Sequence, residues 1–140
     1  MKLAVDASTL IAELMRERGR RLFSRADLQL MVSEHAWVET SRGLERRATA
    51  LRERMEAAAV DDLVDLALST VRTCFIIVPA DLYATHETVA RSRVRDADDW
   101  PTVALALATD SAILTSDPDF LGSGVPTWTY ETLFAELERR

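Results

Sequence analysis

Five acidic residues stand where apolar runs of the sequence begin or end, and together they have the chemistry of a divalent metal site. They are Asp6 in MKLAVD, Glu39 in EHAWVET, Asp98 and Asp99 before WPTVALALA, and Asp117 after AILTS. Carboxylates this far apart in sequence meet only if the apolar runs pack side by side. Several of them in one place repel one another unless a cation joins them. The pattern therefore predicts a site for Mg²⁺ or Mn²⁺ that is assembled by folding.

Histidine and cysteine contribute little to this pattern. His35 and His86 are the only histidines and lie in unlike contexts, and Cys74 is the only cysteine. Zinc sites usually recruit these residue types, whereas carboxylate oxygens suit Mg²⁺ or Mn²⁺. Cys74 cannot form an internal disulfide, and its place in VRTCFIIV predicts a buried thiol.

Short apolar strands that alternate with helical patterns are the elements that would position the acids. Strands are predicted at residues 2–6, 28–33, 75–79, 112–115 and 127–129. Helices are predicted at 9–18, from 34 onward, across 45–72 with a break near 60–62, and at 80–93, 101–110 and 131–140. The alternation predicts one α/β domain over residues 1–140. Its central, mainly parallel sheet would have about five strands, with helices on both faces.

The predicted sheet gives two of the acids a common location. Ligands of open parallel sheets bind beyond the carboxyl ends of the strands, where the strand order reverses. Asp6 ends the first strand and Asp117 lies just after the fourth. We therefore expect both carboxylates at the same edge, with Glu39 and Asp99 reaching it from nearby helices.

Each acid also has a purely structural interpretation. Asp6 could cap the helix that follows it, and Asp98 or Asp99 could cap the helix that contains PTVALALA. Asp117 and Asp119 suit a turn, and Glu39 could be a solvated helix residue. These roles account for single acids, but they give no reason for Glu39 to lie in the apolar stretch AWV.

The ordered set of motifs resembles the PIN domain, in particular the small bacterial VapC-type toxin ribonucleases. The similarity lies in VDAST, the acid of AWVET, DDWPTVALALA and LTSDPDF, whose order and spacing agree from residue 1 to about residue 120. The resemblance implies that Asp6, Glu39, Asp99 and Asp117 are the catalytic and metal-binding core. The register of the small residues that follow favours Asp99 over Asp98 as the third acid of the family.

Four other residues have supporting roles in this resemblance. Ser8 and Thr115 match small polar positions of the family, and their hydroxyl groups would orient a ligand. Asp119 is either a further ligand or a turn residue, and Asp98 lies at the margin of the core set.

The resemblance also implies a function and partners. The chain would be a Mg²⁺- or Mn²⁺-dependent ribonuclease in which metal-activated water cleaves a phosphodiester bond and leaves a 5′-phosphate and a 3′-hydroxyl. RNA, a cognate antitoxin and a second copy of the chain are the expected partners. One alternative is a catalytically inactive PIN-like module that binds RNA. Another is a phosphatase or receiver domain. Ser8 argues against the phosphatase, which needs Asp at this position, and a receiver would need a lysine near the last strand, whereas Lys2 is the only lysine.

Charge and hydropathy limit the kinds of partner surface and the cellular location that the sequence predicts. A net charge of -6 argues against a uniformly basic nucleic-acid surface. Two arginine groups are candidates for phosphate contacts or solvated helix ends: Arg16, Arg18, Arg20, Arg21 and Arg25, and Arg91, Arg93 and Arg95. No run approaches the roughly 18 to 20 apolar residues of a membrane span, and MKLAVDAS lacks the features of a signal peptide, so a cytoplasmic location is expected.

Overall fold

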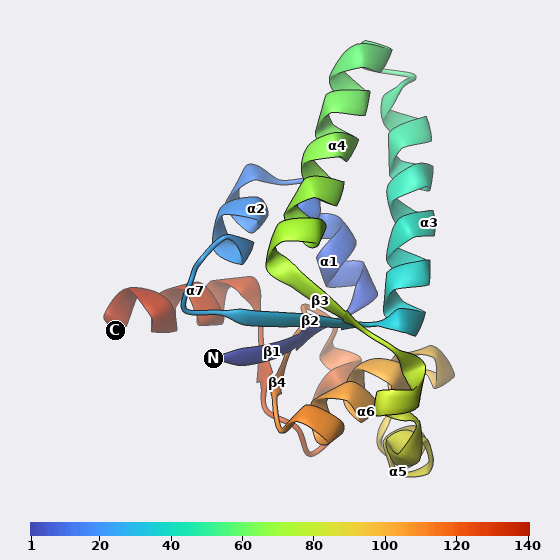
Figure 1. Cartoon of the computed structure of the whole chain (residues 1–140), viewed down its shortest axis with the longest axis vertical. Coiled ribbons are helices and arrows are strands. Elements are labelled where there is room, and N and C mark those ends of the chain that lie inside the picture. The colour runs from blue at the N-terminus through green and yellow to red at the C-terminus, as the bar shows by residue number, and fades with distance from the viewer.

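A five-stranded sheet lies at the centre of the computed structural model, which describes residues 1–140 (Figure 1). Its strands are β1 (Lys2–Val5), β2 (Gln29–Ser33), β3 (Phe75–Val78), β4 (Ala112–Leu114) and β5 (Thr127–Trp128). They are ordered β3-β2-β1-β4-β5, and every neighbouring pair is parallel. The predicted α/β architecture is confirmed, and the sheet is wholly parallel.

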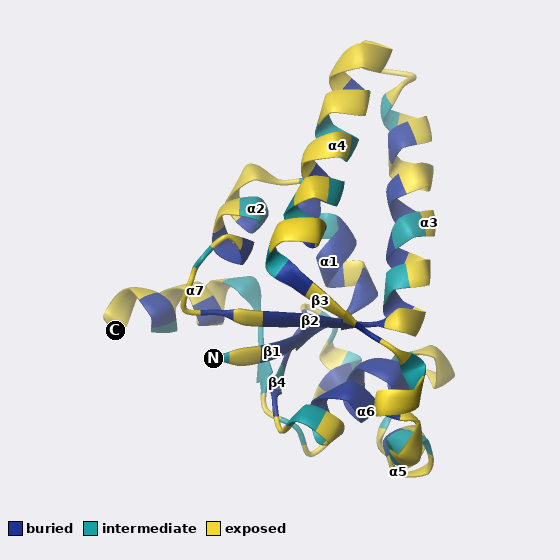
Figure 2. Cartoon of the chain, viewed as in Figure 1, coloured by how far each residue is buried: buried dark blue, intermediate teal, exposed yellow.

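Apolar side chains on both faces of the sheet are buried beneath helices. In β1, Leu3 and Val5 join the apolar cluster on one face, whereas Ala4 between them joins the cluster on the other. This is the two-residue alternation of a strand that is covered on both sides. The first cluster includes α1 (Ala7–Leu14), α2 (Glu17–Phe23), α3 (Glu34–Leu51), α4 (Ala57–Cys74) and α7 (Tyr130–Arg139). The second includes α5 (Glu87–Arg93) and α6 (Trp100–Thr109), and Figure 2 shows α6 as buried over most of its length.

Two helices occupy the segment for which one was predicted at residues 9–18. The chain is extended at Arg16, where φ is -115° and ψ is 139°. The buried carboxylate of Glu13 accepts hydrogen bonds from Arg16 and Arg18 across the break. Gly19 lies directly against the backbone of Glu13, so the second helix packs close to the end of the first.

Replacing Gly19 with alanine is expected to destabilise the fold by about 2 kcal/mol, because an added Cβ would overpack this contact. That Cβ would lie 2.1 Å from the backbone oxygen of Glu13, so relief requires a shift of α1 or α2. Gly43→Ala is the control, because its Cβ would meet the terminal Cδ1 of Ile11, which can rotate away. Urea denaturation of both variants measures the difference. Equal losses would contradict the proposed backbone clash.

The long helical stretch breaks earlier than predicted. Helix α3 continues to Leu51 and α4 begins at Ala57, so the predicted break near residues 60–62 is wrong. Asp61 and Asp62 lie in the second turn of α4, and its first turn contains no acidic residue. Asp61 also accepts a 2.8 Å hydrogen bond from Arg52 across the turn. The two helices form a hairpin that projects from the sheet (Figure 1).

Two short 3₁₀ turns replace the first half of the helix predicted at residues 80–93. They span Ala80–Leu82 and Ala84–His86, and α5 begins only at Glu87. Tyr83 between the turns is fully buried. Its burial fixes a compact turn where the local sequence alone indicated a continuous helix.

The strand order makes the edge beyond β1 and β4 the point where the sheet topology reverses. From β1 the chain runs outward through β2 and β3, and it then returns to β4 and β5 on the opposite side. Asp6 directly follows β1, and Asp117 lies shortly after β4. Ligands bind at such reversal points in open parallel sheets.

None of the helices has the combination of length and apolar character that crossing a membrane requires.

Candidate metal centre

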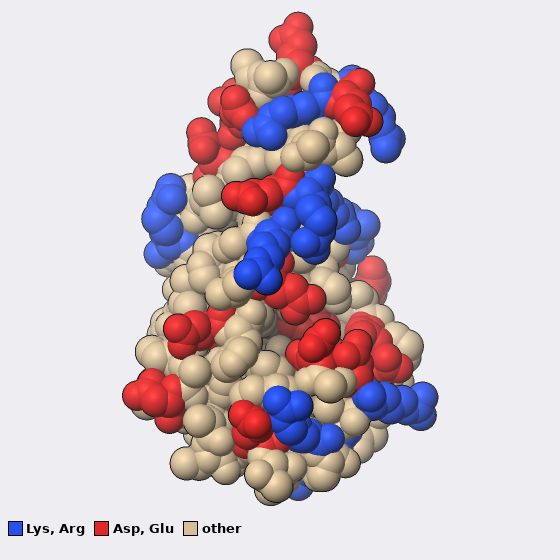
Figure 3. Space-filling model, turned by 90° about the vertical axis from the view of Figure 1, so that its right-hand side faces the viewer, with Lys and Arg blue, Asp and Glu red and all other residues tan.

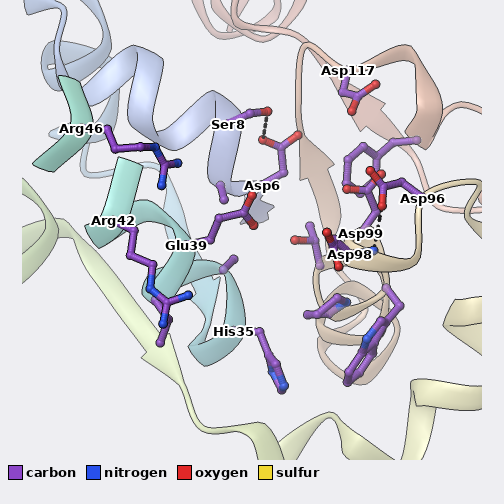
Figure 4. A pocket seen from close by; sticks show the side chains of 17 residues that line it. Asp6, Ser8, His35, Glu39, Arg42, Arg46, Asp96, Asp98, Asp99 and Asp117 are labelled. Atoms are coloured by element: carbon purple, nitrogen blue, oxygen red, sulfur yellow. Dashed lines mark hydrogen bonds between the residues drawn. The ribbon is translucent and has the colours of Figure 1, made fainter. Parts of the chain in front are cut away.

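A polar cavity of about 550 Å³ opens at this edge of the sheet (Figure 4). Six carboxylates line it: Asp6, Glu39, Asp96, Asp98, Asp99 and Asp117. They come from the end of β1, from α3, from the turn before α6 and from the loop after β4. The structure therefore brings the four predicted core acids to one cavity, together with Asp98 and with Asp96, which had not been predicted.

Asp6 is the most deeply held of these acids. The residue is 4% exposed, and its Oδ1 accepts hydrogen bonds from the backbone N–H of Thr9 at 2.7 Å and from the Ser8 hydroxyl at 3.1 Å. Its Oδ2 accepts a hydrogen bond from Thr115. Burial raises the pKa of Asp6, although these hydrogen bonds act in the opposite direction. The residue is thus both the N-cap of α1 and a fixed wall of the cavity.

Asp99 is not explained by a structural role. It occupies the N-cap position of α6, yet its side chain makes no capping hydrogen bond. Its Oδ2 is buried without any hydrogen-bond partner. Burial, followed by the neighbouring carboxylates of Asp96 and Asp117, raises the pKa of Asp99 to about 7. A buried acceptor surrounded by like charges is costly unless a positive ligand faces it.

Asp117 and Asp119 complete a compact group with Asp99. Each of the three offers a carboxylate oxygen, and these oxygens lie within 4.8 Å of one another. Asp117 also accepts a 2.9 Å hydrogen bond from the backbone N–H of Asp119, as a turn residue would. Asp117 therefore forms a turn and belongs to the carboxylate group at the same time. Asp119, which the sequence left as either a ligand or a turn residue, also belongs to the group.

Glu39 reaches the cavity from the other side, on α3 (Figure 4). Burial, and then the charges of Asp98 and Asp6, raise its pKa, while Arg46 lowers it. No hydrogen bond holds its carboxylate, unlike that of Asp6, so the group is free to turn toward a bound species.

Arg42 and Arg46 also line the cavity, and sequence reasoning missed them as it missed Asp96. The two arginines follow Glu39 by three and seven residues, a spacing that puts all three side chains on one face of a helix. Asp96 stands two residues before Asp98, and its Oδ1 accepts a 2.9 Å hydrogen bond from the Asp98 backbone N–H. The position of both arginines beside Glu39 could therefore have been predicted from their helical spacing.

The donor set fits a hard divalent cation. The acids supply only carboxylate oxygens, one of which is buried and unpartnered, and three of the acids have raised pKa values. Oxygen ligands with excess negative charge suit Mg²⁺ or Mn²⁺. Asp99, Asp117 and Asp119 are the residues best grouped to hold such an ion, with Asp6 and Glu39 lining the same space.

Thr115 connects two walls of the centre, and its replacement by valine is expected to weaken Mn²⁺ binding about 10- to 100-fold. Its hydroxyl donates to Asp6 and accepts a 3.0 Å hydrogen bond from the backbone N–H of Asp117. Valine keeps the shape but removes both hydrogen bonds. Ser8→Ala, which removes only an exposed donor to Asp6, should have a smaller effect in the same calorimetric titration. An unchanged affinity in Thr115→Val would show that this link does not support the site.

Comparisons with known proteins agree with the architecture. Residues 4–138 match the family described as PIN domain. PAE2754 from Pyrobaculum aerophilum is similar in structure, with a TM-score of 0.66 at 21% identity, covering 100% of this chain and 91% of that one. VapBC2 from Rickettsia felis, solved bound to a DNA fragment from its promoter, gives 0.62 at 11% identity, covering 92% and 98%. FitAcB from Neisseria gonorrhoeae gives 0.52 at 22% identity, covering 94% and 99%. No curated protein matches the sequence significantly.

The family match spans nearly the whole chain, so it includes every acid of the cavity. PIN domains are generally nucleases, which favours the nuclease interpretation over a phosphatase or receiver domain. The solved structures share the fold at low identity. The chain belongs to the PIN domain family.

Proposed function

We propose that the protein is a Mg²⁺- or Mn²⁺-dependent ribonuclease whose centre contains Asp6, Glu39, Asp99 and Asp117, with Asp119 as an added ligand. The observation that carries this proposal is the buried, unpartnered Oδ2 of Asp99 beside other carboxylates. If Asp99 had a purely structural role, its carboxylate would cap α6, but it makes no capping hydrogen bond. Membership of the PIN domain family supports the nuclease class.

The chemistry of a phosphodiester explains why such a centre is needed. The bond is anionic and resists attack by neutral water. A bound divalent ion supplies a Lewis acid that neutralises phosphoryl oxygens and lowers the pKa of the attacking water. Asp99, Asp117 and Asp119 would hold such an ion, and Thr115 and Ser8 fix the carboxylate of Asp6 by donating hydrogen bonds to it.

Glu39 is the residue best suited to move a proton. Its carboxylate has no hydrogen-bond partner, and its raised pKa makes it a stronger base than an ordinary glutamate. We propose that one of its oxygens accepts the proton of the attacking water. Asp98, which is exposed and raises the pKa of Glu39, acts through charge in this scheme.

Cleavage of single-stranded RNA by the purified protein tests the proposal. We expect cleavage in Mg²⁺ or Mn²⁺ and none in EDTA, with products that carry a 5′-phosphate and a 3′-hydroxyl. Metal binding without cleavage of any RNA would contradict the enzyme and favour an inactive RNA-binding module. Cleavage that persists in EDTA would contradict the role of the metal.

We further propose that the protein is the toxin of a toxin–antitoxin pair and forms a homodimer. The similarity in fold to VapBC2 and FitAcB supports this assignment. Expression with and without the neighbouring open reading frame tests it, and growth arrest that the neighbour suppresses is the expected result. Harmless expression with RNA cleavage would point instead to a processing nuclease. Light scattering of the purified protein tests the dimer.

A further inference from the structure

Four arginines on one side of the molecule are free of protein partners. Arg42, Arg46 and Arg47 lie on α3 and Arg54 just beyond its end, and together they are called the α3 arginine ridge below. None of their guanidinium groups makes an ion pair or a hydrogen bond, and all four residues are exposed. Figure 3 shows basic side chains gathered above the acidic patch on the face that carries α3.

Most other arginines are engaged within the protein. Ion pairs with acids hold Arg16, Arg18, Arg21, Arg25, Arg52, Arg91, Arg139 and Arg140. Arg20 and Arg93 donate to the backbone carbonyls of Leu14 and Ser123. The two arginine groups that the sequence singled out are therefore largely occupied, whereas the ridge is not.

The ridge is continuous with the acidic cavity. Arg42 and Arg46 line that cavity beside Glu39, and Figure 4 shows both side chains next to it. The same two arginines line a neighbouring hollow with Glu45 and Thr49. Arg46 also borders a third hollow, together with Arg47 and Arg54. All three hollows share Arg46, so they adjoin one another at this side chain.

The spacing and charge of the ridge fit a chain of phosphates. Arg42 and Arg46 are four residues apart, so they lie about 6 Å apart along the helix axis, similar to the step between neighbouring phosphates in an extended strand. Guanidinium groups bind phosphate through paired hydrogen bonds. An acidic protein segment would instead bring more carboxylates to a cavity that already holds six. A net charge of -6 favours a few local contacts over a broad basic face.

We infer that the α3 arginine ridge binds consecutive phosphates of a single-stranded RNA and leads the strand into the acidic cavity, with Arg42 and Arg46 making the contacts nearest the centre. A single strand suits this path because it can bend between the ridge and the cavity. The inference rests on the proposed nuclease function for what happens to the strand in the cavity. The binding path itself follows from the ridge.

The test compares RNA binding by the double variant Arg42→Gln/Arg46→Gln with that of the wild type. The control is Arg72→Gln/Arg139→Gln, which also removes two positive charges at exposed positions outside the three hollows. Of these two arginines, Arg139 is paired with Glu136. Fluorescence anisotropy of a labelled single-stranded RNA, in EDTA over a range of salt concentrations, measures affinity without cleavage. We expect the ridge variant to bind about 10-fold more weakly or worse, and its log–log salt slope to be shallower by about 1.4, or about 0.7 per lost contact. The control should keep the wild-type affinity and slope.

Each outcome separates the ridge from the nuclease proposal. Equal binding by the ridge variant and the control would overturn the ridge, even if the wild type cleaves RNA in Mg²⁺. If the ridge variant binds RNA more weakly but the wild type cleaves no RNA in any divalent ion, the RNA-binding role of the ridge is supported and the proposed nuclease activity is contradicted. If the variant binds RNA normally but loses a protein partner, the ridge is a protein interface and the inference is wrong. Unchanged thermal midpoints would verify that both variants fold.

Discussion

Replacing Asp99 with asparagine is expected to abolish metal-dependent RNA cleavage while making the metal-free protein more stable. Residues that only support a metal ligand cost about 10- to 100-fold when removed, so loss of a ligand should exceed about 100-fold. Asparagine removes the charge that Asp96 and Asp117 repel, and its amide can donate to those carboxylates. Cleavage rates in Mn²⁺ measure the first effect and urea denaturation in EDTA measures the second.

The expected gain in stability is about 1 to 2 kcal/mol at neutral pH. A pKa of about 7 in place of 3.8 would correspond to more, but Asp99 is only partly buried, so solvent screening reduces the figure. Asp65→Asn is the control, because it removes one exposed carboxylate on α4, outside the cavity. Full activity of Asp99→Asn would remove this residue from the mechanism. A less stable variant would mean that the carboxylate has a structural role after all.

The metal-free protein is expected to lose stability as the pH rises from about 4 to about 7. Asp6, Glu39 and Asp99 all have raised pKa values, so the folded state binds their protons more tightly than the unfolded state does. Stability falls with pH wherever the folded state holds more protons. The window runs from the ordinary carboxyl values to the pKa of about 7 for Asp99. Urea denaturation in EDTA across this range measures the loss.

A divalent ion should reverse this loss at neutral pH. An ion that binds only the folded state adds about 2.7 kcal/mol when its concentration is 100 times its dissociation constant. Because protons compete with the ion for the same carboxylates, the gain should be large at neutral pH and vanish near pH 4. Asp99→Asn should flatten both curves. Stability in EDTA that rises steadily with pH would contradict the account of the acidic cluster.

The edge location of the acids was predictable because parallel strands share a direction. Asp6 and Asp117 follow apolar strands, and strand ends in a parallel sheet fall at one edge whatever the intervening chain does. Asp99 followed from the register of small residues in α6. Glu39 depended mainly on resemblance, since a glutamate on a helix carries no positional signal of its own.

Other features depend on tertiary contacts that local sequence patterns do not reveal. Helix α3 ends at Leu51 and α4 begins at Ala57, and Arg52 donates to Asp61 across the turn between them. The acids that suggested a break therefore lie inside α4. The 3₁₀ turns around Tyr83 depend on its complete burial. Which arginines remain free could be known only once the ion pairs of the folded chain were visible.

Calorimetric titration of the wild-type protein with Mn²⁺ at neutral pH tests the central claim most directly, because the claim is that folding assembles these carboxylates into a divalent metal site. We predict saturable binding accompanied by proton release, since the pKa of about 7 leaves Asp99 partly protonated in the free protein. Asp99→Asn should lose this binding, whereas Asp65→Asn should retain it. No heat of binding at millimolar Mn²⁺, or equal binding by Asp99→Asn, would contradict the account.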